Sequence, residues 1–160
     1  MRFGRLSDSM EKIQRKTWYG LKATIIFGPG FMHTSGWGVF LIPHPPLANW
    51  LLRLGMKAKR RKALTFTHEF EHLQSAPLIF LYVLIQSFLV FSKKQADPSE
   101  IGLILLGSHA AWEIISEILT YFHDSSIYRS SYQEIPISPR ILFWSVACLT
   151  VIVSWLIVLS

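Results

Sequence analysis

The chain has 160 residues, of which 51% are hydrophobic and only 16% are charged. This balance is typical of a small integral membrane protein and argues against an ordinary soluble domain. The formal net charge is +6, and 12 of the 16 Lys and Arg residues lie in residues 1–72. Because apolar segments follow this basic half, we expect it to contact anionic membrane lipids and expect no nucleic-acid partner. The single cysteine, Cys148, excludes an intramolecular disulfide and a cysteine-based zinc site.

Residues 1–22 are predicted to form an amphipathic helix at the membrane surface. Leu6, Met10 and Ile13 fall on one stripe of such a helix, and Trp18 is a side chain that favours the headgroup level. A solvated helix packed on the protein is the alternative interpretation. The first residues are polar and basic, so no cleavable signal peptide is predicted.

Two short β-type segments follow, at residues 23–27 and 37–42. Glycine and proline residues break the chain after each of them, so together they predict a short β-hairpin or two short strands, and a broken or re-entrant membrane helix is the alternative. His33 and His44 lie in this region, and the sequence leaves their roles open.

Residues 46–63 predict a second amphipathic surface helix. Its apolar stripe leads into a basic cluster at residues 57–62, which predicts an anchor to lipid headgroups on the cytoplasmic side. A solvated run of charges is the alternative.

Three later segments are candidates to span a membrane. The first, residues 64–92, becomes mainly apolar from Leu73 to Ser92, about 20 residues and just enough to span, and the other two are residues 99–122 and 141–159. The sequence therefore predicts one mainly α membrane domain over residues 1–160. We expect a helical bundle of about three spanning helices, with amphipathic surface helices and a short β-hairpin before the first span. Residues 1–63 would form its basic interfacial region. This distribution of charge predicts a cytoplasmic N-terminus, and we expect the protein in a bacterial inner membrane.

The first spanning segment opens with an H-E-x-x-H pattern, His68-Glu69-Phe70-Glu71-His72. Histidines four residues apart project from one face of a helix, so their nitrogens can bind one Zn²⁺ ion. Glu69 lies beside them, where it can take a proton from a water molecule on the metal. A chance match in a structural helix is the alternative, but ionisable groups at the mouth of a membrane helix are usually functional.

The second spanning segment contains three ionisable residues, an unusual number for a buried helix: His109, Glu113 and Glu117. The turn before it is short, so the two helices should be antiparallel neighbours. At roughly 1.5 Å per residue, Glu117 is level with His72 and Glu113 is about one turn deeper. Either carboxylate is a candidate third metal ligand, and a polar pair inside the bundle is the alternative.

These two motifs together resemble those of the gluzincin zinc metalloproteases, in which H-E-x-x-H precedes E-x-x-x-D on a second helix. The resemblance implies that Glu113 binds zinc and that Glu117 supports His68. The membrane setting is similar to that of the CAAX-prenyl and heat-shock membrane zincins. Gln74-Ser75 also matches the end of the H-E-x-G-H-x-x-Q-S pattern of small bacterial membrane proteins. The chain departs from these patterns at Glu71, where Gly is common, and at Glu117, where Asp is usual.

The function implied by this resemblance is that of a zinc-dependent membrane hydrolase, a metallopeptidase that cleaves a peptide bond at the membrane surface. Glu69 would be catalytic, and the substrate would be a peptide, a lipoprotein or a lipid-linked molecule. His109, Tyr121 and His123 are candidates for stabilising the oxyanion, and the sequence does not choose among them.

Two other classes of function remain open. The H-x-x-x-H spacing also occurs in membrane di-iron oxidases and hydroxylases, although the clustered H-x-x-H-H motifs of those enzymes are absent from this sequence. A non-catalytic membrane scaffold with an internal network of acids and histidines is the third interpretation.

Overall fold

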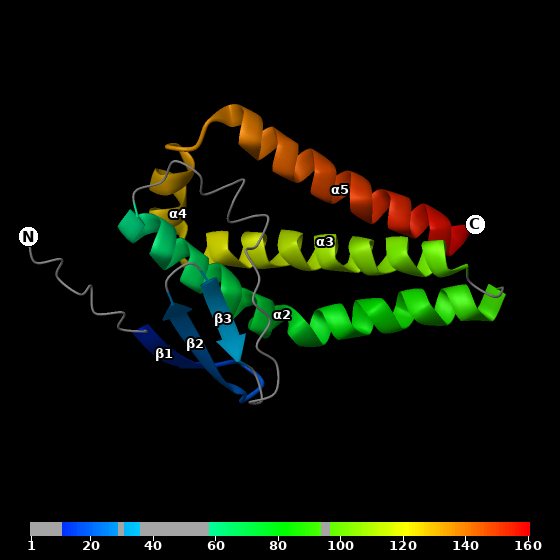
Figure 1. Cartoon of the computed structure of the whole chain (residues 1–160), viewed down its shortest axis with the longest axis horizontal. Helices are drawn as coiled ribbons and strands as arrows, with labels where there is room; N and C mark the ends of the chain where they lie inside the picture. The colour runs from blue at the N-terminus through cyan, green and yellow to red at the C-terminus, as the bar shows by residue number, and fades with distance from the viewer. Residues whose placement is uncertain (1–10, 29–30, 36–57, 94–96) are drawn as a thin grey trace, which may run out of the picture. The chain divides into compact units, whose positions relative to one another are not determined.

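The structure of the chain is a computed structural model that describes residues 11–28, 31–35, 58–93 and 97–160 (Figure 1). Contacts divide the chain into two compact units, Met1–Pro46 and Leu47–Ser160. The single domain expected over residues 1–160 stays a prediction.

The first unit contains a three-stranded antiparallel sheet in the order β1-β2-β3. Its strands are β1 (Glu11–Lys16), β2 (Lys22–Gly28) and β3 (Phe31–Ser35). In the turn from β1 to β2, Gly20 has φ = 93°, a left-handed conformation that glycine adopts without steric cost. The Thr17 hydroxyl accepts a hydrogen bond of 2.9 Å from the Leu21 N–H and holds the turn closed.

The structure corrects the sequence prediction in this unit. The surface helix expected over residues 1–22 is wrong for residues 11–16, which form β1, and residues 1–10 lie outside the described residues. Pairing with β2 supplies the backbone hydrogen bonds of β1, and no local pattern reveals such a partner. The strand expected at 23–27 is confirmed as β2, but its second neighbour is β3, and the strand expected at 37–42 lies outside the described residues.

The second unit is a helical bundle, as predicted. Its helices are α2 (Ala58–Lys93), α3 (Pro98–His123), α4 (Ser125–Tyr132) and α5 (Ile137–Leu159). Three segments, Thr67–Ser92, Pro98–His123 and Ile137–Leu159, are long and apolar enough to cross a membrane. Their outer faces expose large apolar side chains, as expected for helices that contact lipid.

Two boundaries differ from the prediction. Helix α2 starts at Ala58, so residues 58–63 of the expected surface helix belong to the motif helix, and residues 46–57 lie outside the described residues. The polar connection expected after the second span contains a further helix, α4. The Thr67 hydroxyl of α2 donates a hydrogen bond of 2.5 Å to Asp124, directly before α4. This bond ties the end of α3 and the start of α4 to the motif helix.

Helix α3 lies between α2 and α5 (Figure 1) and contacts both along its length. A Cβ atom at Gly107 would overlap the side chain of Ser154 on α5, so glycine permits the close approach of these two helices. A buried polar link joins all three long helices: Gln86 donates to Ser154 Oγ at 3.1 Å and accepts from Ser108 Oγ at 3.0 Å. These contacts set the register of α3 against α2, and this register positions the acidic residues of α3 relative to the histidines of α2.

Candidate metal centre

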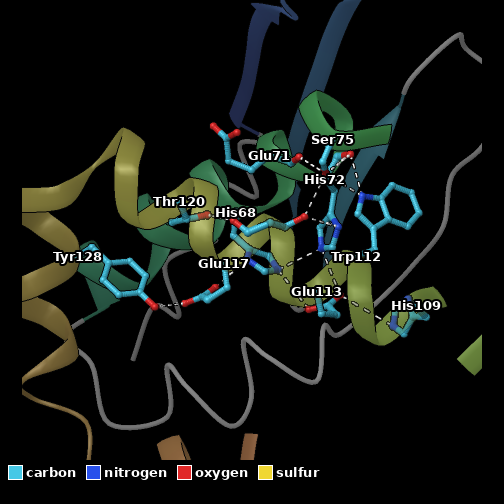
Figure 2. A network of polar contacts seen from close by, with 11 residues as sticks. His68, Glu71, His72, Ser75, His109, Trp112, Glu113, Glu117, Thr120 and Tyr128 are labelled. Carbon is cyan, nitrogen blue, oxygen red and sulfur yellow. Dashed lines mark hydrogen bonds and ion pairs between the residues drawn. The ribbon is translucent and has the colours of Figure 1, made fainter. Parts of the chain in front are cut away.

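The H-E-x-x-H motif lies in α2 and brings its two histidines together (Figure 2). The Nε2 atoms of His68 and His72 are 3.1 Å apart. Glu113 of α3 completes a triangle, because its Oε1 lies 3.2 Å from Nε2 of His72 and its Oε2 lies 3.3 Å from Nε2 of His68. The predicted antiparallel packing of the two helices therefore brings one carboxylate between both imidazoles.

The dimensions of this triangle suit a metal ion. Ligand atoms roughly 2.0–2.1 Å from a tetrahedral zinc ion lie about 3.3 Å from each other. The two nitrogens are 3.1 Å apart and lie 3.2 and 3.3 Å from the two different oxygens of Glu113, and one ligand atom from each residue lies within 4.8 Å of the others. Two imidazoles and one carboxylate are also a donor set of catalytic zinc sites, which keep a further position open. His68, His72 and Glu113 can thus hold a metal ion.

Glu117 lies outside this triangle, although the sequence named it as a candidate ligand. Its Oε2 atom is 2.8 Å from Nδ1 of His68, on the other side of the imidazole. Its second oxygen, Oε1, accepts a hydrogen bond of 2.7 Å from the hydroxyl of Tyr128 on α4. A carboxylate at Nδ1 favours the tautomer whose Nε2 lone pair faces the triangle.

His72 has a comparable partner at its own Nδ1 atom. The hydroxyl of Ser116 on α3 lies 2.9 Å from that nitrogen. The indole N–H of Trp112 donates to the backbone carbonyl of His72 and to Ser75 Oγ, each at 3.0 Å. Each imidazole therefore has a partner at its Nδ1 atom, the Glu117 carboxylate for His68 and the Ser116 hydroxyl for His72.

The residues that hold the two imidazoles were not all predicted. Trp112, Ser116 and Tyr128 were missed. Trp112 and Ser116 belong to a polar stripe on α3, with Glu113, Glu117 and Thr120, at three- and four-residue spacing. That stripe was visible in the sequence. Tyr128 gave no such signal, because its contact with Glu117 depends on how α4 packs.

Burial differs among the residues of the centre. The side chain of His68 is fully buried, and that of Glu113 is 9% exposed. The side chain of His72 keeps 13% exposure, so the triangle is most open at this histidine. Glu69 is half-buried and close enough to His72 for its charge to act on that ring.

The other candidate residues take different positions. His109 is exposed, and its Nε2 lies 3.9 Å from Glu113 Oε1, beyond hydrogen-bond range. His123 contacts the buried Glu71, with 2.9 Å between Nδ1 and Oε1. Tyr121 accepts hydrogen bonds from Arg129. None of these three supplies an atom to the triangle; His33 lies on β3, and His44 is outside the described residues.

No protein-family model, curated protein or solved structure matches this chain. The resemblance to zinc metalloproteases therefore rests on the motif residues alone.

Proposed function

We propose that the protein is a zinc-dependent membrane hydrolase, and specifically a metallopeptidase. The observation that carries the proposal is the group of His68, His72 and Glu113, in which the two Nε2 atoms lie 3.1 Å apart and 3.2 and 3.3 Å from the carboxylate oxygens of Glu113. These residues come from two antiparallel helices that are each apolar enough to span a membrane. Ionisable side chains within a membrane span are energetically costly, so their presence in these helices supports a functional role.

Each residue of the centre has a role in this proposal. A zinc ion held by the three ligands would polarise a carbonyl group and lower the pKa of a water molecule. Glu69 takes a proton from the water that attacks the carbonyl carbon, and it passes this proton to the departing amine nitrogen. Glu117 and Ser116 hold the two imidazole rings in position through Nδ1.

The position of the motif suggests the class of substrate. His68 and His72 lie at the start of the segment Thr67–Ser92, which is one of the three candidate spans. A bond cleaved there lies near the membrane surface, so we propose a peptide, a lipoprotein or a lipid-linked substrate. The basic amino-terminal half supports a cytoplasmic location of the centre in a bacterial inner membrane.

The described residues favour one metal ion over two. They contain one group of His, Cys, Asp and Glu side chains with metal-ligand spacing, the triangle itself. A di-iron oxidase needs enough ligands for a second ion, but His109 lies 3.9 Å from Glu113, His123 contacts Glu71, and neither forms a second group with metal-ligand spacing among the described residues. A non-catalytic polar network remains the competing account, and the presence of bound metal separates the two.

The test is hydrolysis by the purified full chain of a library of quenched fluorescent peptides, with Glu69→Gln beside the wild type. Glu69→Gln keeps the size of the side chain but removes the base, so turnover should fall at least about 100-fold. Glu134→Gln, in an exposed turn, removes the same charge and should retain wild-type turnover. Full activity of Glu69→Gln would refute the mechanism.

A further inference from the structure

A second site lies behind the candidate metal centre. A cavity of about 490 Å³ opens among α3, α4 and α5. This volume is within the range of roughly 300–1,000 Å³ that small-molecule sites occupy. Five aromatic side chains dominate its wall: Tyr121, Phe122, Tyr128, Tyr132 and Trp144.

The cavity is separate from the metal-binding side of His68. Glu117 lines the cavity and also contacts Nδ1 of His68, whereas the triangle forms at Nε2 of the same ring. The His68 side chain is fully buried between the two. A molecule in the cavity therefore cannot reach the position that the three ligand atoms surround. The substrate of the proposed reaction is therefore not the molecule that this cavity binds.

One cationic side chain, Arg129, lines the cavity. Two of its nitrogens, Nε and Nη2, donate to the hydroxyl of Tyr121 at 3.1 and 2.7 Å. A guanidinium carries five N–H donors, so Arg129 keeps donors for a further acceptor. Among the described residues no carboxylate forms an ion pair with it, because Glu117 is committed to His68 and Tyr128. The cavity thus combines an apolar wall with a positive charge at an exposed position.

The hydroxyl of Tyr132 provides a hydrogen-bond donor in addition to the charge of Arg129. Tyr132 accepts a hydrogen bond of 2.7 Å from the indole N–H of Trp144. Partial burial raises the pKa of Tyr132, so its hydroxyl stays neutral and keeps a proton that it can donate.

The position of the cavity indicates where its occupant comes from. Helix α4 connects two candidate spans, α3 and α5, so the cavity lies at the boundary of the membrane. Ile118 and Phe122 line it and are 43% and 72% exposed, which opens its wall toward lipid chains. Basic pockets between membrane helices at this level bind the headgroups of anionic lipids.

We propose that the cavity binds one anionic phospholipid of the surrounding bilayer. An acyl chain packs against the aromatic wall, and the phosphate accepts hydrogen bonds from Arg129. Tyr132 donates a further hydrogen bond to the headgroup. This site does not depend on the proposed hydrolysis, and it forms whether or not metal is bound.

Native mass spectrometry of the full chain in detergent tests the site, with phosphatidylglycerol and phosphatidylcholine of identical acyl chains as probes. The wild type should bind phosphatidylglycerol about tenfold more tightly, since both lipids carry a phosphate but only phosphatidylcholine brings a choline cation near Arg129, and a like-charge contact that costs about 1.4 kcal/mol gives that factor. Arg129→Gln should weaken the binding of phosphatidylglycerol and should bind the two lipids equally, because it removes both the hydrogen bond to the phosphate and the repulsion of choline. Ile118→Trp, which fills the cavity from an exposed position, should weaken the binding of both lipids.

Arg129→Lys is the matched control, because it keeps the positive charge at the same position and should retain the preference for phosphatidylglycerol. Equal binding of the two lipids by the wild type would overturn the proposal. So would an unchanged affinity for phosphatidylglycerol in Arg129→Gln, or tight binding of both lipids by Ile118→Trp. Each variant changes an exposed or half-buried side chain, and a thermal unfolding curve checks that it folds.

Discussion

Glu117 and His68 are in contact through Oε2 and Nδ1, 2.8 Å apart, on the side of the imidazole opposite the three candidate ligand atoms. This contact meets two requirements of a metal-binding histidine, a defined ring orientation and a defined tautomer. Glu117→Ala should therefore lower zinc affinity by about 10- to 100-fold without removing a ligand. Competition with a chromophoric zinc chelator measures this change. An unchanged affinity would mean that Glu117 does not orient His68.

Tyr128→Phe removes the hydroxyl that donates to Glu117 Oε1 and leaves the ring in place. A hydrogen bond to a charged group contributes about 1.5–3 kcal/mol, so the free energy of unfolding should fall by about this amount. The variant should lose less zinc affinity than Glu117→Ala, because Glu117 still faces His68. Chemical denaturation and the same chelator competition give the two values. A loss of affinity as large as that of Glu117→Ala would contradict this ranking.

Removal of metal should destabilise the wild-type protein. A ligand at 100 times its Kd stabilises the folded state by about 2.7 kcal/mol, so a strong chelator should lower the Tm and added zinc should restore it. His72→Ala lacks one ligand of the triangle, and its Tm should not respond to chelator. If the Tm of the wild type is equally insensitive, the acids and histidines form a metal-free polar network.

Gly107 and Gly102 provide a matched pair for the packing of α3. A Cβ atom at Gly107 overlaps Ser154 of α5, whereas a Cβ atom at Gly102 meets nothing within 4 Å. Gly107→Ala should therefore lower the free energy of unfolding by about 1–3 kcal/mol. Gly102→Ala should leave it unchanged or slightly higher. Equal effects of the two substitutions on unfolding in detergent would rule out close α3–α5 packing.

The helices of the bundle and the two histidines of the motif were predictable because their signals are local. Apolar length identifies a spanning segment, and four-residue spacing puts His68 and His72 on one helix face. Helix spacing alone did not decide between Glu113 and Glu117, although the resemblance to the gluzincin pattern implied Glu113 at the metal and Glu117 at His68. The choice depends on the register of α3 against α2, and a shift of one turn exchanges the two carboxylates.

Strand β1 and helix α4 show where local patterns fail. The apolar spacing near Ile13 predicted a helix, but β1 forms because β2 pairs with it, a contact between segments distant in sequence. Helix α4 is short and polar, so it resembled a loop. Its contribution to the centre, Tyr128, became visible only through the packing of α4 against α3.

Zinc content per chain, measured by elemental analysis of the purified full chain, tests the central claim most directly. We predict about one zinc ion in the wild type, in Glu69→Gln and in His109→Ala, because none of these changes touches the triangle. His72→Ala and Glu113→Ala should retain almost none. A wild-type protein that contains no zinc and takes up none when zinc is added would contradict the proposed centre, and so would full zinc content in both ligand variants.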